Sequence, residues 1–184
     1  MARVPYVEQE DLDPEYRELI ISSLQPGKRA NVYSAVGNNQ EVLDGLRTFL
    51  GSLWTHSGLT DRQREIVILT AASEIANDYE WHQHVIIGTD AGLSENEIAA
   101  IGRDDRADFD DDERALVAYS RAVVCGRVND SVHEAAVDHF GEETAVGAAA
   151  TAAGYLALGR VIDALGVDLE GDDEFVGWDL ENRE

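Results

Sequence analysis

The chain has very little of several residue types. It contains one cysteine, Cys125, and three prolines, all within the first 26 of its 184 positions, and Lys28 is its only lysine. A single thiol forms neither an internal disulfide nor a CxxC redox pair. The sequence has no run of about 18 consecutive apolar residues, and no apolar block with a cleavage site stands near its start. We therefore expect a cytoplasmic protein without a membrane partner.

Positive charge is also scarce. Fourteen basic residues face 37 acidic ones, which gives a formal net charge of −23, and the acidic residues are spread from Glu8 to Glu184. Such a field repels phosphate backbones, so we expect no nucleic-acid partner. Molar salt shortens the electrostatic screening length to about 3 Å and removes the self-repulsion, so we predict adaptation of the whole surface to a high-salt cytoplasm. The alternative is a specific acidic binding face.

Helical periodicity dominates the sequence and predicts an all-α fold. Capping patterns, such as Thr60 with Gln63 and Ser94 with Glu97, mark where helices begin. The predicted helices run over about residues 15–24, 40–54, 60–77, 78–92, 94–101, 111–125, 131–141 and 143–165.

The same patterns divide the chain into three parts. We predict an N-terminal arm (1–29), one helical domain (30–166) and an acidic C-terminal tail (167–184), whose apolar residues dock on the body or on a neighbouring subunit. A short match between residues 60–69 and 110–119 suggests that the domain contains two related helical halves.

The densest group of titratable and aromatic side chains is the segment 77–84, Asn-Asp-Tyr-Glu-Trp-His-Gln-His. On a helix, Glu80 and His84 are four residues apart and share a face, so the carboxylate can orient the imidazole or hold its proton. His82 lies about 200° around the helix from both. The alternating pattern is therefore not a metal site on one helix, and we expect neither a metal nor another cofactor.

Three segments around this group, residues 64–69, 77–85 and 92–98, resemble the signature of the carboxymuconolactone decarboxylase family, which also contains the alkylhydroperoxidase D proteins. The resemblance is good over about residues 47–101. It implies an alkylhydroperoxidase D-like helical bundle that assembles as a closed homo-oligomer, a trimer or a hexamer.

In the peroxidase branch of that family, the reaction centre consists of a glutamate, two cysteines and a histidine. The resemblance places the glutamate at Glu65 and the histidine at His84, which the family uses for proton transfer. The two cysteine positions hold Asn77 and Glu80, so no thiolate is present there to attack a peroxide. If two antiparallel helices turn near Asn77, residue counting leaves a mismatch of about 7 Å along the helix axis between Glu65 and His84. The resemblance instead implies that these two residues meet.

The one thiol lies elsewhere. Cys125 follows three apolar residues, 122–124, and this setting predicts a buried and inert core thiol. Peroxidase activity through Cys125 stays as a disfavoured alternative.

These features predict an enzyme like the decarboxylase branch, a lyase that acts on a small organic acid or lactone by general acid–base catalysis. Decarboxylation leaves a carbanion or enolate that must be protonated. An imidazole that titrates near neutral pH suits this task, so we expect His84 to exchange the proton, with Glu65 or Glu80 tuning it.

Three further residues are predicted to bind the substrate: Tyr79, Trp81 and Arg64. Arg160 is a second candidate, beside Arg64, to hold a substrate carboxylate. Core packing is the alternative for the two aromatic residues, and a helix-surface ion pair is the alternative for both arginines. Two other functions stay open. One is a non-catalytic helical oligomer or small-molecule-binding protein, and the other is a metal enzyme that uses the three acid–base side chains as ligands.

Overall fold

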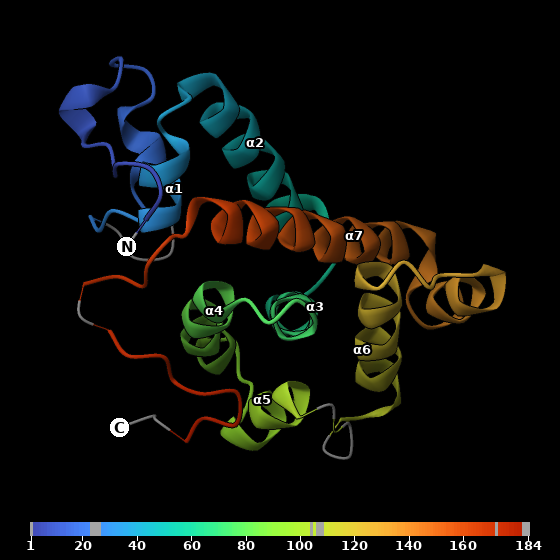
Figure 1. Cartoon of the computed structure of the whole chain (residues 1–184). Coiled ribbons are helices and arrows are strands. Elements are labelled where there is room, and N and C mark those ends of the chain that lie inside the picture. Colours follow the sequence, from blue (N-terminus) through green and yellow to red (C-terminus); the bar gives the residue numbers. More distant parts are fainter. Residues whose placement is uncertain (1, 23–26, 104, 106–108, 172, 182–184) are drawn as a thin grey trace.

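The computed structural model describes residues 2–22, 27–103, 105, 109–171 and 173–181. Its architecture is all-α, which confirms the predicted fold class (Figure 1). One isolated β-bridge joins Ile21 and Arg29. Within the described residues, the helices follow in the order η1 (Gln9–Asp11), η2 (Arg17–Ile20), α1 (Asn31–Val36), α2 (Gln40–His56), α3 (Asp61–Glu74), α4 (Asp78–Asp90), α5 (Glu95–Gly102), α6 (Asp111–Val124) and α7 (Asp130–Leu165).

Helix α3 is the centre of the fold, and α4, α5, α6 and α7 all pack against it. In Figure 1, α7 runs across the top of α3, α4 and α6, while α5 lies beneath them. Every residue of α3 from Arg64 to Ala72 is buried. The stretch Ile66–Leu69 is apolar on all sides, as expected for a helix with neighbours on every face. A polar side chain in this part of α3, such as Glu65, therefore needs a partner inside the protein.

The turn between α3 and α4 fastens the start of α4 to α7. The Asn77 side chain caps α4 by accepting a hydrogen bond from the Glu80 amide at 2.9 Å. Its side-chain nitrogen donates to the Gly159 carbonyl at 3.1 Å and to Asp163 Oδ1 at 2.8 Å, both on α7. Asp78, the cap expected from the sequence, is instead the first helical residue. Asn77 serves better because its amide carries an acceptor for the cap and a donor for α7.

Other helix ends also differ from the prediction. The predicted break at Gly141 is confirmed, because its φ of 77° is non-helical and divides α7 into two helical parts at a kink, but Asn129 rather than Ser131 caps the start of α7. The predicted helix over 15–24 is reduced to η2, and Leu24 lies outside the described residues. Helix α1 was not predicted, because its six residues are too few to show a clear period.

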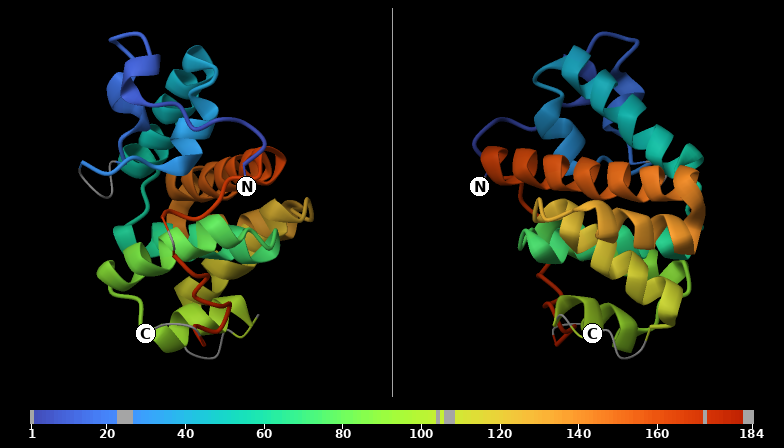
Figure 2. Two further views of the ribbon diagram at one scale, coloured as in Figure 1. Left: turned by 60° about the vertical axis from the view of Figure 1, so that its left-hand side comes forward. Right: turned by 90° about the vertical axis from the view of Figure 1, so that its right-hand side faces the viewer.

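The C-terminal tail packs against the body of its own chain. Figure 2 shows it running from the end of α7 past α4 toward α5. The Trp178 ring lies 5.1 Å from the Trp81 ring, and Trp81 Nε1 donates to the Gly177 carbonyl at 2.9 Å. A Cβ at Gly102 would lie 2.0 Å from the Trp178 carbonyl oxygen, so this close approach requires glycine.

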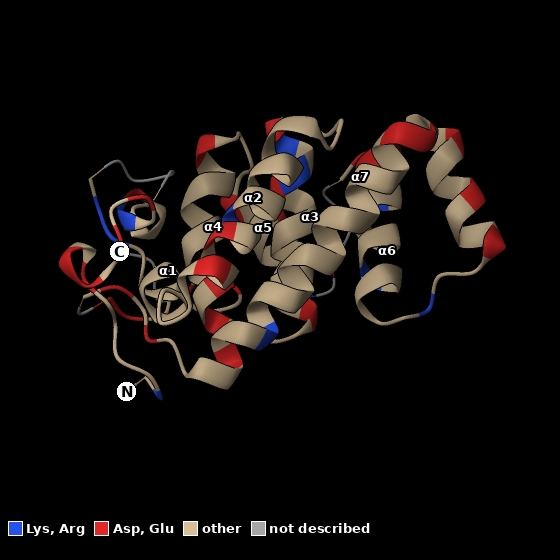
Figure 3. Ribbon diagram, turned by 90° about the horizontal axis from the view of Figure 1, so that it is seen from above, with Lys and Arg blue, Asp and Glu red and all other residues tan. Residues whose placement is uncertain are grey.

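Helix α7 is long and apolar enough to cross a membrane by length and composition alone. Its most apolar window is 56% buried inside the protein, and the helix packs on α2, α3, α4 and α6, which is typical of a core helix. Figure 3 shows acidic residues on many different elements. Adaptation to high salt stays a prediction from this distribution.

Candidate active site

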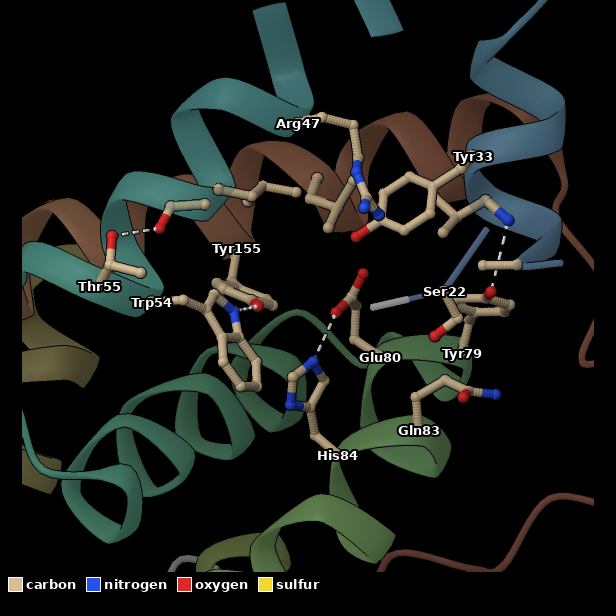
Figure 4. Close-up of a pocket in the computed structure, with 15 residues that line it drawn as sticks. Ser22, Tyr33, Arg47, Trp54, Thr55, Tyr79, Glu80, Gln83, His84 and Tyr155 are labelled. Atoms are coloured by element: carbon tan, nitrogen blue, oxygen red, sulfur yellow. Dashed lines mark hydrogen bonds and ion pairs between the residues drawn. The ribbon is translucent and has the colours of Figure 1, made fainter. Parts of the chain in front are cut away.

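A cavity of about 440 Å³ lies between α2, α4, α7 and the segment that leads into α1 (Figure 4). Four aromatic residues, Tyr33, Trp54, Tyr79 and Tyr155, form much of its wall. Aliphatic side chains from α2 and α7 complete the apolar part. A largely apolar enclosure of this size, with a few polar groups, suits a small organic molecule.

One face of α4 supplies most of the polar groups in the wall. Tyr79, Glu80, Gln83 and His84 all line the cavity, because positions i, i+1, i+4 and i+5 fall on one side of a helix. In Figure 4, Glu80 and His84 rise from α4 toward the cavity, with the Glu80 carboxylate above the imidazole ring.

Glu65, His84 and Glu80 form a buried chain of titratable groups. His84 Nδ1 lies 2.7 Å from Glu65 Oε2, which accepts its hydrogen, and His84 Nε2 lies 3.6 Å from Glu80 Oε2. Glu65 is fully buried behind the histidine, on α3, while Glu80 lines the cavity. The mismatch of about 7 Å that helix counting leaves between Glu65 and His84 does not keep them apart, and the contact implied by the family resemblance is present. The arrangement connects the cavity to a carboxylate in the protein core.

The surroundings of this chain shift two of its pKa values. Burial disfavours the charged form of Glu80 and raises its pKa to about 7; His84 opposes the shift, and Glu65 and Glu170 add to it. Burial also disfavours the charged His84 ring, but the carboxylates of Glu65 and Glu80 outweigh this and raise the His84 pKa above its usual value. The site therefore holds a proton that can be donated or accepted near neutral pH, on an oxygen that lines the cavity.

Aromatic rings hold the imidazole in place. The His84 ring meets the Tyr155 ring edge-on at 5.1 Å and lies 6.4 Å from the Trp54 ring. Trp54 Nε1 donates to the Tyr155 hydroxyl at 2.8 Å. Burial raises the pKa of Tyr155 well above its usual value, so this hydroxyl keeps its proton. The Trp54 and Tyr155 rings therefore pack around the imidazole, and both also line the cavity.

The predicted substrate contacts lie in three different settings. Tyr79 lines the cavity, and its hydroxyl donates to the Glu170 carboxylate in the tail. Trp81 does not line the cavity, because it lies on the opposite face of α4 against Trp178. Arg64 also lies outside the lining. The position of Trp81 therefore gives no support to a role in substrate binding.

Arg64 instead contacts Glu65, at the end of the acid–base chain away from the cavity. Its guanidinium carbon lies 3.9 Å from the centre of the Trp54 ring, and Nη2 donates to Asp61 at 2.9 Å. Its Nε lies 3.6 Å from Glu65 Oε1, the oxygen that does not face His84. Arg64 itself is 4% exposed, and the ion pair considered from the sequence is present, formed with the exposed carboxylate of Asp61 on the same helix.

Sequence reasoning missed several lining residues, of which Arg47 is the most significant. Arg47 lies on α2, on the side of the cavity opposite Glu80 (Figure 4). Tyr155 and Trp54 were also missed. All three belong to helices remote from the 77–84 segment in sequence, and no local pattern marks them as neighbours of His84.

The two carboxylates approach different nitrogens of the His84 ring, so they do not converge on one point. Among the described residues, no group of three or more His, Cys, Asp or Glu side chains is arranged to hold a metal ion. The geometry is that of one hydrogen bond, from His84 to Glu65, and one longer ion-pair contact, between His84 and Glu80.

The cysteine of this protein lies away from the cavity. Cys125 ends α6, and its thiol is exposed, so the prediction of a buried core thiol is wrong. The chain turns at Gly126, where φ is 64°, and this turn directs the preceding side chain outward despite its apolar neighbours. Burial and the Glu74 carboxylate, which accepts from Cys125 Sγ at 3.4 Å, raise the pKa of the thiol. A protonated thiol is a weak nucleophile.

The family model of the carboxymuconolactone decarboxylase family matches residues 40–122. This segment is therefore similar to that family. It spans α2 to most of α6, and it therefore contains Glu65, Glu80, His84 and Arg47. A comparison with curated protein sequences gives no match.

Solved structures share the fold over most of the chain. The alkylhydroperoxidase AhpD core of an uncharacterized peroxidase-related protein from Ralstonia eutropha JMP134 superposes with a TM-score of 0.83, at 21% identity over 97% of this chain and 96% of that one. A cysteine-to-alanine variant of the debrominase Bmp8, in complex with 2,3,4-tribromopyrrole, gives a TM-score of 0.73 at 18% identity over 91% of each chain. A protein of unknown function from Agrobacterium tumefaciens, thought to act in antioxidant defence, gives 0.68 at 20% identity over 74% of this chain and 96% of that one. These similarities establish an AhpD-like helical fold.

Proposed function

We propose that this protein is an acid–base enzyme of the decarboxylase type, acting on a small organic acid or lactone, and that Glu80 exchanges protons with the substrate. The observation that carries the proposal is the Glu80 carboxyl group. It lines a largely apolar cavity, has a pKa of about 7, and is connected through His84 to a second carboxylate. A group that titrates near neutral pH is an efficient proton donor and acceptor there.

The reaction is a replacement of carbon dioxide by a proton. The bond from the substrate carbon to its departing carboxylate breaks, and the electron pair stays on the carbon as an enolate. The Glu80 carboxyl donates its proton to that carbon, and His84 Nε2 then returns a proton to Glu80. His84 regains its proton from water after the product has left. Glu65 keeps the imidazole oriented and favours its charged form, whereas the positive charge of Arg64 acts to lower the His84 pKa.

The lack of a thiol in the cavity argues against the other chemistries found in this fold. Cys125 is the only cysteine in the sequence, and it does not line the cavity. Thiol-dependent peroxidase chemistry needs a thiolate at the site where the peroxide binds. A protein that binds a small molecule without turnover is the second candidate, and the apolar cavity by itself supports it.

Proton exchange in heavy water separates these candidates. The protein is incubated with 4-carboxymuconolactone and related unsaturated carboxy-lactones in deuterium oxide, and carbon dioxide release and deuterium in the product are measured. We expect Glu80→Gln to lose about 10²- to 10⁴-fold in rate, the usual contribution of a general acid. Arg160→Met removes a positive charge from an exposed site on α7 and serves as the matched control. A loss of less than about tenfold in Glu80→Gln would contradict the assigned role.

A further inference from the structure

Among the residues that the structure describes, Arg47 is the only Lys or Arg in the lining of the cavity. Its guanidinium carbon lies 4.3 Å from the centre of the Tyr33 ring, which holds the side chain by a cation–π contact. Figure 4 shows the guanidinium descending from α2 toward the space above Glu80. Arg47 and Glu80 thus face one another across the cavity from different helices.

Arg47 interacts with Tyr33, and its side-chain hydrogen bond acts to lower the pKa of the Tyr33 hydroxyl, but one end of the guanidinium has no partner in the described part of the chain. Its Nη1 is buried and has no hydrogen-bond partner among the described residues, and within the same ranges Arg47 forms no ion pair. Burying a charged group without a partner costs several kcal/mol or more, roughly, unless something compensates for it. The Tyr33 ring supplies only about 1–2 kcal/mol of this.

The contrast with two other arginines of the chain, the half-buried Arg62 and the buried Arg64, makes the unpartnered Nη1 of Arg47 informative. Arg62 pairs with Glu97 and Glu113, and Arg64 pairs with Asp61. The chain has 37 acidic residues for 14 basic ones, so a carboxylate partner is the ordinary state of an arginine here. Arg47 differs because its open side faces the cavity rather than another helix.

We propose that Arg47 binds a carboxylate of the substrate and that the ligands of this cavity are planar carboxylates with an apolar body. The guanidinium offers a planar fork of donors that matches a carboxylate, while the rings of Trp54 and Tyr155 pack on the apolar part. The proposal rests on the acid–base function in one respect. With one carboxylate held by Arg47, the reacting carbon lies at the opposite end, near Glu80. The carboxylate on Arg47 is therefore one that stays on the substrate.

The test compares a charged probe with a neutral probe of the same shape. Benzoate and benzamide are titrated into the wild-type protein by calorimetry at fixed ionic strength, and Trp54 fluorescence gives a second signal. We expect the wild type to bind benzoate more tightly than benzamide. Arg47→Met should weaken benzoate about 10- to 100-fold, the equivalent of one charged hydrogen-bonded contact, and should change benzamide by less than about threefold.

Three further variants control the interpretation. Arg47→Lys keeps the charge and loses the fork, so it should recover only part of the benzoate affinity. Arg160→Met removes one exposed positive charge and should leave both affinities unchanged. Glu80→Gln removes the opposing carboxylate and should bind benzoate at least as tightly as the wild type. Thermal unfolding of each variant shows whether it is folded. If Arg47→Met does not fold, Arg47→Lys and the comparison of benzoate with benzamide in the wild type still test the proposal.

Two results would overturn the proposal. One is equal affinity of the wild type for benzoate and benzamide, or a benzoate dissociation constant weaker than about 10 mM, where binding contributes under about 3 kcal/mol. The other is benzoate affinity that is the same in Arg47→Met and the wild type. Binding is measured without turnover, so these failures differ from failure of the acid–base function, which appears as full activity in Glu80→Gln.

Discussion

The two faces of α4 are equally buried and yet have opposite chemistry. On one face, Glu80 and His84 are each 4% exposed, and they meet charged groups and a cavity. On the other face, Trp81 is fully buried, and His82 is 6% exposed. Trp81 packs against the tail, in the apolar cluster that also contains Leu116 from α6. Burial therefore does not separate site from core on this helix, and the partners of each side chain do.

The two histidines of α4 make the contrast most direct. His84 has a carboxylate on each side of its ring, at 2.7 and 3.6 Å. His82 Nε2 lies 3.8 Å from the carboxylate of Asp173, and its Nδ1 has no hydrogen-bond partner in the described part of the chain. His84 belongs to the proposed proton pathway, whereas His82 contacts the C-terminal tail.

Replacing each histidine by glutamine should produce the largest difference in proton-exchange rate between variants of the two faces. We expect His84→Gln to lose about 10²- to 10⁴-fold in substrate proton exchange, because the link between Glu80 and Glu65 is broken. His82→Gln should stay within about threefold of the wild type, since it contacts no cavity group. Product deuteration in heavy water measures both. Similar losses in the two variants would show that the faces do not differ in function.

Truncation on the tail-facing side should affect stability rather than chemistry. Trp81→Ala removes a fully buried ring that packs on Trp178, and we expect it to cost about 3–5 kcal/mol in the free energy of unfolding. Urea titration followed by circular dichroism measures this value. Benzoate affinity of the folded protein should change little, because Trp81 does not line the cavity. A loss of under about 1 kcal/mol would contradict the packing role.

The cavity face should make stability depend on pH. The Glu80 pKa is raised from 4.5 to about 7 in the folded protein, so its contribution is fully present below about pH 4.5 and is lost as the pH rises to about 7. Glu80→Gln cannot titrate. The free energy of unfolding of Glu80→Gln, compared with that of the wild type, should therefore rise by on the order of 2 kcal/mol between pH 4.5 and pH 8. Urea unfolding at both pH values, in constant salt, tests this. An unchanged difference between variant and wild type at the two pH values would exclude a raised Glu80 pKa.

The smallest effect is expected at Cys125, which lies on neither face. Its thiol is exposed, and in the described part of the chain its one side-chain hydrogen bond goes to Glu74. Cys125→Ser should therefore change the free energy of unfolding by less than about 0.5 kcal/mol. No thiol-dependent peroxidase turnover should be present in the wild type. A wild-type peroxidase activity that disappears in Cys125→Ser would reverse this conclusion.

Local rules explain what the sequence could predict. Capping boxes and apolar periods located the long helices, and a spacing of four residues placed Glu80 and His84 on one face of α4. Helix counting did not predict the contact between Glu65 and His84. The turn before α4 contains Ala76 in the left-handed region, with φ of 52°, and such a residue changes the direction of the chain. A count based on the rise per residue does not include this change of direction.

Long-range packing explains what it could not predict. Trp81 and Trp178 meet although 97 positions separate them, and nothing near either residue marks the contact. Arg47 and Tyr155 reach the cavity from α2 and α7 for the same reason. Cys125 was placed in the core because of its apolar neighbours, but its position at the end of α6 decides its exposure.

The most direct test of the account is the titration of Glu80 itself. Carbon-13 NMR of the glutamate side-chain carboxyls, with the Glu80 signal assigned by its loss in Glu80→Gln, gives the midpoint. We predict a midpoint near pH 7 in the wild type and a higher one in His84→Gln, because the imidazolium that favours the charged carboxylate is then absent. A Glu80 midpoint near the ordinary value of 4.5, unmoved by His84→Gln, would contradict the proposed proton pathway.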